Sequence, residues 1–411
     1  MLSLRNFNVN KLTLKNWQII LFFFLMSLSS FTSLGDPQGQ NISFDFYGDT
    51  IQVPCGYLSV VDYKGPLSDE SIQNFYDEIS ATNYKQVVQA LLAYKLKNRP
   101  DDWLFYQLIR KTAQLTSPKA ANYYRYTLYK WFLLNKTGYD ATLCLAGDKL
   151  MFYVQSEENI YDIPYYKENG KQYVCLNYHD YANIDIVHSE LHKVAVYDIG
   201  EKVAFSYKLT HLPNFHPGDY KEKDLEFNYH DVEYHIRLKT NEQVKTILAN
   251  YPVTDYNDYF NLPLSNGTYS SLIPELKKNI KGMSVKNGVD YLMNFTRYAF
   301  AYEPDKENFG KEKHLSAEQT LLYDHSDCED RAALFYYLVK EVYNLPMIVL
   351  AYPHHLTIAV KFDKPIGKPI LYNGSEYSIC EPTPQERDLP IGRMSHDLKN
   401  TSYEVAVVYN P

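Results

Sequence analysis

Three short segments near the C-terminus most constrain how this chain can fold, because each should lie at the end of a different helix or strand. They are residues 326–331, 352–355 and 377–383. In chain order they supply a thiol, an imidazole and a carboxylate: Cys328, His355 and Glu381. An imidazole beside a thiol favours the nucleophilic thiolate, and a carboxylate on the second ring nitrogen holds the imidazole in place. These three residues are therefore the candidate catalytic residues.

The first segment predicts the start of a helix. Ser326 and Glu329 have the spacing of a capping box, which places Cys328 in the first helical turn. Apolar residues then recur at helical spacing and form one face: Phe335, Leu338, Val339 and Val342. The helix should end before Pro346, because a proline restricts the residue that precedes it. At the positive end of the helix dipole, the pKa of the Cys328 thiol is expected to be lowered.

Strands are expected at residues 347–352, 356–362 and 377–380. In the second strand the alternation predicts that Leu356, Ile358 and Val360 face one way. His355 and Thr357 should face the other way, where small neighbours leave room for the helix of Cys328. Glu381 directly follows the third strand, which ends at a proline.

These segments resemble the transglutaminase-like superfamily, whose fold is related to that of papain-type cysteine peptidases. The carrying motifs are Cys328-Glu329-Asp330-Arg331-Ala332-Ala333-Leu334-Phe335, His355 before Ala359-Val360, and Glu381-Pro382-Thr383. Residues 309–321 are similar to the lead-in of a set of bacterial envelope members. The sequence departs from the family pattern twice, with Glu381 in place of the usual Asp and His354 where Gly is common. The resemblance implies an α+β fold with a transglutaminase-like, papain-like catalytic domain at residues 246–411.

The N-terminal half contains a weak internal repeat of this pattern. Residues 125–154 align without gaps to 331–360, an offset of 206 (331 − 125) that pairs Asn122 with Cys328 and Lys149 with His355. An offset of 204 pairs Asn177 with Glu381 (381 − 177). Residues 36–180 are interpreted as an α+β module, either a degenerate transglutaminase-like copy without its catalytic residues or a chance similarity. The two readings stay open. If the copy is real, Asn122, Lys149 and Asn177 should lie close together.

Between these two parts, alternating apolar residues predict antiparallel strands. Val203, Phe205, Tyr207 and Leu209 alternate with polar or small residues, as do residues 225–229 and 232–238. We expect a central antiparallel β domain at residues 185–245, folded as a small sandwich.

The first 35 residues have the layout of a secretory signal, with basic residues followed by an apolar run and then small residues. An uncleaved anchor is the alternative. The resulting expectation is an exported protein, periplasmic or in the cell envelope, with no membrane span in the mature chain. If Cys328 stays free, the remaining four cysteines could form no, one or two disulfides: Cys55, Cys144, Cys175 and Cys380.

Charge and composition exclude some partners. The net charge is −8, from 41 basic and 49 acidic residues, and without a long basic run nucleic-acid binding is not expected. No cofactor or metal is expected either, since His188, Glu190 and His192 depart from the H-E-x-x-H pattern of zinc peptidases.

Two functions remain open. The first is an exported thiol enzyme that acts on peptide or glutamine-type amide bonds through an acyl-enzyme on Cys328, as a peptidase, amidohydrolase or transglutaminase-type acyltransferase. The second is a catalytically idle scaffold that binds peptides or envelope partner proteins. For the oxyanion of an acyl-transfer reaction, the backbone N–H of Cys328 is the leading donor and Gln319 the alternative. The substrate and the oligomeric state do not follow from the sequence.

Overall fold

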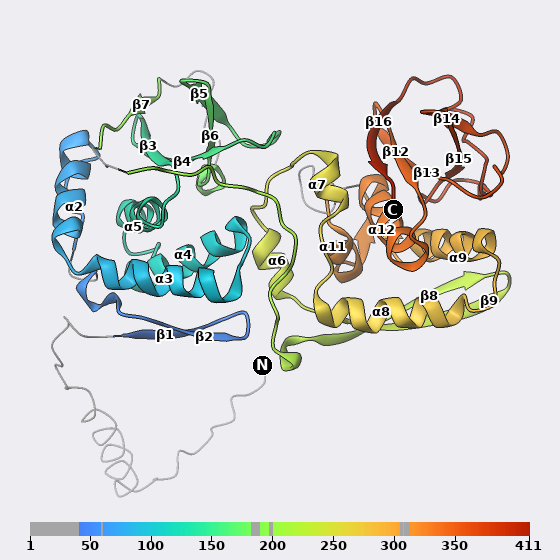
Figure 1. Cartoon of the computed structure of the whole chain (residues 1–411), viewed down its shortest axis with the longest axis horizontal. Coiled ribbons are helices and arrows are strands. Elements are labelled where there is room, and N and C mark those ends of the chain that lie inside the picture. Colours follow the sequence, from blue (N-terminus) through green and yellow to red (C-terminus); the bar gives the residue numbers. More distant parts are fainter. Residues whose placement is uncertain (1–40, 59–60, 182–189, 197–199, 305–306, 308–312) are drawn as a thin grey trace, which may run out of the picture.

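The computed structural model describes residues 41–58, 61–181, 190–196, 200–304, 307 and 313–411. The expected signal segment at residues 1–35 and His188 lie outside the described residues. The protein is a mixed α+β fold in which helices pack against curled antiparallel sheets, with the two sheets at opposite ends of the molecule (Figure 1). Within the described residues no helix has the length and apolar character needed to cross a membrane.

In the described residues, the N-terminal half has a hairpin, then four α-helices and then a five-stranded sheet. Its elements are β1 (Ile42–Phe46), β2 (Asp49–Val53), α2 (Asp69–Ala81), α3 (Tyr84–Asn98), α4 (Asp102–Thr116), α5 (Tyr123–Lys136), β3 (Ala141–Ala146), β4 (Lys149–Ser156), β5 (Tyr165–Glu168), β6 (Lys171–Cys175) and β7 (His192–Lys193).

The C-terminal half has the same order of hairpin, helices and five-stranded sheet. Its elements are β8 (Lys221–Tyr229), β9 (Val232–Thr240), α6 (Gln243–Leu248), α7 (Tyr256–Phe260), α8 (Asn266–Asn279), α9 (Val285–Tyr298), β10 (Ala301–Tyr302), α11 (Ala317–Leu322), β11 (His325–Ser326), α12 (Cys328–Tyr343), β12 (Met347–Tyr352), β13 (His355–Val360), β14 (Ile370–Tyr372), β15 (Ser375–Cys380) and β16 (Glu404–Tyr409).

The two five-stranded sheets correspond strand by strand. The strand order is β5-β6-β4-β3-β7 in one and β14-β15-β13-β12-β16 in the other. The register agrees as well, since Lys149 pairs with Ala146 and His355 pairs with Tyr352 at equivalent places in the two hairpins. In both halves a long helix, α5 or α12, precedes the first sheet strand and packs against the sheet. The internal similarity therefore extends from sequence pattern to topology and register.

The middle of the chain differs from the expected sandwich. The described part of residues 185–245 contains one two-stranded sheet, β8-β9, together with β7, which belongs to the N-terminal sheet. The apolar face of the hairpin packs on α8 and α9, at the base of the C-terminal half (Figure 1). Phe205 and Tyr207 are buried without forming a named strand. Alternation predicts that one face of a strand is buried, but it does not say whether a sheet or helices will cover that face.

The hydrophobic core is continuous through both halves. One cluster of buried apolar side chains runs from the β1-β2 hairpin to β16. At the junction, Trp103 of α4 donates its indole N–H to the carbonyl of Ile247 in α6, at 2.9 Å. In the C-terminal sheet, Leu356, Ile358 and Val360 join this cluster, whereas Ala359 belongs to a separate cluster on the other face. The expected alternation of β13 is confirmed. The expected place of the helix is wrong, because the apolar side chains of α12 share the cluster of Leu356, Ile358 and Val360, and Met394 and Leu398 cover the face of Ala359.

Candidate functional site

Helix α12 begins at Cys328 and is capped by Asp327. The Asp327 side chain accepts a bond from the N–H of Asp330, and the Asp330 side chain accepts one from the N–H of Asp327. This capping box lies one residue later than the expected Ser326 and Glu329 pair, which is therefore a wrong prediction. The helix ends at Tyr343, with Asn344 in the left-handed conformation, before Pro346 as expected.

Two buried residues that follow Cys328 fix the start of the helix in place. Asp330 accepts a 2.7 Å bond from the N–H of Leu315 in addition to its capping bond. Arg331, which has no exposed surface, donates to the carbonyls of Arg297 and Phe300 and to the hydroxyl of Ser326. Ser326 still belongs to β11, where it pairs with Tyr302 of β10, so the chain leaves its strand at Asp327 and Asp327 caps the helix. Asp330 and Arg331 of the Cys328 motif therefore stabilise the start of α12 and its attachment to neighbouring segments.

His355 and Glu381 form a close pair. Nε2 of His355 lies 2.8 Å from Oε2 of Glu381, and their side chains are 16% and 2% exposed. The second carboxylate oxygen of Glu381 accepts a 3.0 Å bond from the N–H of Thr383. Burial alone would lower the pKa of His355, but the hydrogen bond and charge of Glu381, with a contribution from Glu329, raise it above the ordinary value. Because Nε2 bonds to Glu381, Nδ1 is the ring nitrogen of His355 that can exchange a proton with another group.

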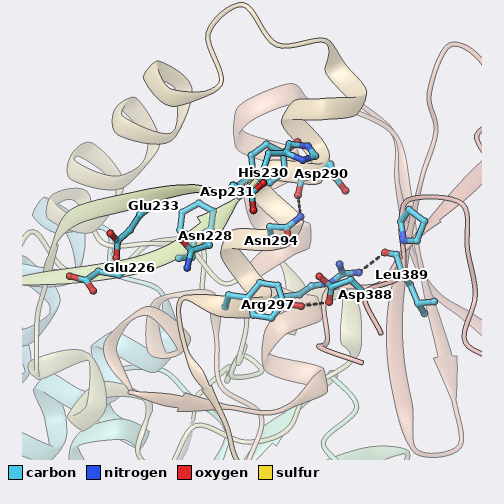
Figure 2. Close-up of a pocket in the computed structure, with 14 residues that line it drawn as sticks. Glu226, Asn228, His230, Asp231, Glu233, Asp290, Asn294, Arg297, Asp388 and Leu389 are labelled. Atoms are coloured by element: carbon cyan, nitrogen blue, oxygen red, sulfur yellow. Dashed lines mark hydrogen bonds between the residues drawn. The ribbon is translucent and has the colours of Figure 1, made fainter. Parts of the chain in front are cut away.

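Arg297 is a residue of the site that sequence reasoning missed. Its guanidinium is 3% exposed and donates to the carbonyls of Glu381 and Leu389, with Nε 2.8 Å from the Glu381 oxygen. Figure 2 shows that the side chain of Arg297 extends from α9 to the segment that carries Leu389. The residue fixes the backbone on which the Glu381 carboxylate is carried. No local motif marks it, because its acceptors lie 84 and 92 residues away in the sequence.

Arg297 also lines an acidic cavity of about 960 Å³ (Figure 2). The cavity lies among the tip of the β8-β9 hairpin, α9 and residues 388–390. Its carboxylates are Glu226, Asp231, Glu233, Asp290 and Asp388.

The thiol of Cys328 has an environment different from the one expected. It donates to Oε2 of Glu329 at 2.7 Å. Burial, then the charge and hydrogen bond of Glu329, then the charge of Asp327 raise the pKa of Cys328 well above its ordinary value. The backbone N–H of Leu356, the residue after His355, acts in the opposite direction. The expected lowering of the thiol pKa is wrong, because a neighbouring carboxylate and burial outweigh the helix terminus.

Two tyrosines lie near Cys328 and Glu329, and Gln319, the alternative oxyanion donor, lines a separate small cavity. The charges of Cys328 and Glu329 raise the pKa of Tyr256 and Tyr302, after the larger effect of burial. Oε1 of Gln319 accepts from the N–H of Ser316, and its buried Nε2 has no hydrogen-bond partner among the described residues. Gln319 lines a small cavity of about 60 Å³ whose wall includes His314.

A metal site receives little support from the cysteine segment. Asp327, Cys328 and Glu329 each offer a ligand atom, all within 4.8 Å of one another. However, Asp327 already accepts the capping bond of Asp330, and the thiol donates to Glu329. All five cysteines are free thiols, which resolves the open question of pairing: Cys55, Cys144, Cys175, Cys328 and Cys380.

In the N-terminal half, the places of the three candidate residues hold different side chains. Asn122 caps α5 as Asp327 caps α12, so Tyr123 is the first residue of its helix, as Cys328 is. The proposed match of Asn122 to Cys328 is therefore one residue out of step. Nδ2 of Asn177 donates to the hydroxyl of Tyr123 at 2.9 Å and to the carbonyl of Leu150 at 2.8 Å. Asn177 thus contacts the residues that follow Asn122 and Lys149. Asn122 itself donates to the carbonyl of Tyr63, and Lys149 bonds to Asp148, so the predicted cluster of Asn122, Lys149 and Asn177 is formed by neighbours of the first two and not by those side chains.

No protein-family model, no curated protein and no solved structure matches the chain. Arguments about its function therefore rest on the residues and geometry described above.

Proposed function

We propose that the protein is a thiol enzyme that forms an acyl-enzyme on Cys328, with His355 as proton carrier and Glu381 as its orienting acid. The 2.8 Å pair of His355 and Glu381 carries the proposal. Helix α12 packs against β13, and the N–H of Leu356 reaches the thiol, so Cys328 and His355 are on adjoining elements. The resemblance to transglutaminase-like proteins implies the same three roles.

The reaction follows from the arrangement of the ring nitrogens. Neutral His355 donates Nε2–H to Glu381 and takes the thiol proton at Nδ1. The Cys328 thiolate then attacks the carbonyl carbon of an amide, and a C–S bond forms. As the C–N bond breaks, the imidazolium returns the proton to the leaving amine. The product is a thioester on Cys328.

The acceptor of the acyl group determines the type of enzyme. Water, deprotonated at Nδ1 of His355, gives hydrolysis, whereas a second amine gives transamidation. We favour a peptide or cell-envelope peptide substrate and hydrolysis. The backbone N–H of Cys328 is one of the free donors at a helix start and would stabilise the oxyanion.

Glu329 has to be displaced before attack. At rest its carboxylate accepts a hydrogen bond from the thiol, and its charge disfavours the thiolate. A substrate that enters between Glu329 and the thiol would remove both the hydrogen bond and the nearby charge. The thiol of Cys328 would then react slowly in the free protein and faster once a substrate is bound.

A peptide library incubated with the protein and a small primary amine tests this function. Mass spectrometry should detect cleaved or amine-modified peptides with the wild-type protein, and none with Cys328→Ala. Cys144→Ala, a matched loss of a thiol in the N-terminal half, should retain activity. Turnover by Cys328→Ala would place the nucleophile elsewhere.

The second candidate is a peptide-binding scaffold. It is favoured by the raised pKa of Cys328 and by the N-terminal half, which we interpret as a degenerate copy with Tyr123 in place of the nucleophile. Equal peptide binding by the wild type and Cys328→Ala, without turnover by either, would support the scaffold. Either function is proposed to operate outside the cytoplasm, on the basis of residues 1–35; the N-terminal mass of the exported protein tests this location.

A further inference from the structure

A second large cavity lies where the N-terminal half meets α6, far in sequence from Cys328. Its volume is about 590 Å³, and it lies among the turn between β1 and β2, α4 and α6. Three cationic side chains line it, against the single carboxylate of Asp45: Arg110, Lys111 and Lys119. Asp45 is itself engaged, since it accepts a 3.2 Å bond from the N–H of Gly48. The cavity wall is therefore predominantly positive.

A buried amide in this wall lacks a partner. Gln107 is 6% exposed, and its Oε1 accepts a 3.0 Å bond from Arg110. Its Nε2 has no hydrogen-bond partner among the described residues. A buried donor without an acceptor destabilises the folded protein. An acceptor atom inside the cavity would remove that cost.

Arg110 is already oriented for an anion. Its guanidinium lies over the ring of Tyr106 at 5.9 Å, donates to Gln107 and bonds to the hydroxyl of Tyr126, which leaves further N–H donors of its planar fork. Lys111 is exposed and has no ion-pair partner among the described residues. Lys119 contributes less, because its ammonium lies 2.6 Å from the Asp180 carboxylate.

The remaining wall fits the body of an organic ligand rather than a bare ion. Phe46, Tyr47 and Tyr126 provide aromatic surface. Oε1 of Gln243, from α6, is a buried acceptor without a partner among the described residues. A ligand hydroxyl would satisfy it.

We propose that this cavity binds a small hydroxylated molecule that carries an oxyanion group, a phosphate or a carboxylate. Arg110, the amide of Gln107 and Lys111 hold the oxyanion, and Gln243 accepts a hydroxyl. The site is independent of the chemistry at Cys328. Charge-assisted bonds from a guanidinium to an oxyanion are about twice as strong as neutral ones, so Arg110 should contribute most of the affinity.

Isothermal titration calorimetry at low salt tests the proposal with four probes: glucose 6-phosphate, gluconate, inorganic phosphate and uncharged glucose. We expect glucose 6-phosphate or gluconate to bind more tightly than inorganic phosphate, and glucose not to bind; the tighter of the two identifies the oxyanion. Arg110→Met should weaken binding about tenfold or more. Lys111→Met, at an exposed position, should weaken it severalfold without disturbing the fold.

Lys85→Met is the matched control, because Lys85 is an exposed lysine of α3 outside the cavity. It should bind as the wild type does. The proposal is overturned if none of the anionic probes binds at millimolar concentrations. Equal affinities for Lys111→Met, Lys85→Met and the wild type would also overturn it, since binding would then not depend on this cavity.

Discussion

Two opposing influences act on the thiol of Cys328. It lies at the start of α12, where the helix dipole and the N–H of Leu356 favour a thiolate. Burial and the carboxylate of Glu329 oppose them and prevail, so that the pKa is raised. Sequence alone could identify Cys328 as a helix-start cysteine. It could not show the direction in which the Glu329 side chain turns, and that direction determines the sign of the pKa shift.

Glu329→Gln should make Cys328 more reactive. The substitution removes the neighbouring charge and keeps the size of the side chain. A fall of one unit in the thiol pKa gives about tenfold more thiolate at neutral pH, so alkylation should be about tenfold faster or more. The measurement is the rate of iodoacetamide labelling of Cys328, located by peptide mass. Glu341→Gln, at the other end of α12, should leave the rate unchanged; equal rates in all three proteins would contradict the role given to Glu329.

Glu381→Gln should lower the rate of turnover by about 10²–10⁴, by comparison with the acids of known triads. It should also change the pH dependence. The protonated imidazole cannot take the thiol proton, so activity should rise as pH increases through the pKa of His355, which Glu381 holds above its ordinary value. In the variant this rise should move to lower pH. Glu376→Gln, on the exposed face of β15, is the control. A pH–rate profile identical to that of the wild type would show that Glu381 does not act through His355.

Among the elements, helix and strand positions followed from sequence more reliably than the details of their ends. The strand at 347–352 was predicted to the residue, because a short apolar run lies between proline-containing turns. The cap of α12 was predicted one residue too early. Two pairs have the spacing of a capping box, Ser326 with Glu329 and Asp327 with Asp330, and the structure uses the second pair. The choice depends on Ser326, which stays in β11 and pairs with Tyr302 of β10. That pairing is visible only in the folded protein.

Helix α5 contains a buried lysine that should give the protein a measurable pH dependence. Burial lowers the pKa of Lys130 to about 7, although Asp180 partly opposes the shift. Between about pH 7 and the unfolded value of about 10.4, the unfolded chain binds more protons than the folded one. The free energy of unfolding should therefore rise with pH across this window. Lys130→Met should flatten the rise, as measured by Tm; Lys136→Met on the same helix should not. A slope unchanged by Lys130→Met would contradict the buried-lysine account.

At the scale of the whole molecule, the two halves share a topology and a continuous core. The shared strand order was only hinted at by the offset in sequence, because strand order depends on pairings that no local pattern contains. The β8-β9 hairpin was misread as a separate domain for the same reason. The N-terminal half keeps the architecture but places Tyr123 and Asn177 where Cys328 and Glu381 stand. We interpret it as a structural partner of the half that carries the candidate site.

Because the core is continuous, the two halves should unfold together. Arg297→Lys would remove bonds to the carbonyls of Glu381 and Leu389 and should destabilise the protein by about 2–4 kcal/mol. Trp103 and Trp131 both lie in the N-terminal half, Trp103 at the junction with α6, so their fluorescence reports on that half and on the junction. In urea, the fluorescence midpoint of the variant should fall together with the midpoint from circular dichroism. Arg393→Lys, at an exposed position, is the control. An early dichroism step with unchanged fluorescence would mean that the halves unfold independently.

The central claim is that Cys328 forms an acyl-enzyme, and an acid quench tests it most directly. The protein is mixed with peptides found to be turned over, quenched in acid within the first turnovers, and analysed by intact mass and peptide mapping. The account predicts a mass increase equal to the acyl fragment, located on Cys328 and removed by hydroxylamine. The adduct should not form with Cys328→Ala and should form far more slowly with His355→Ala, because His355 takes the thiol proton. Turnover without any adduct on Cys328, or an adduct on another residue, would contradict the account.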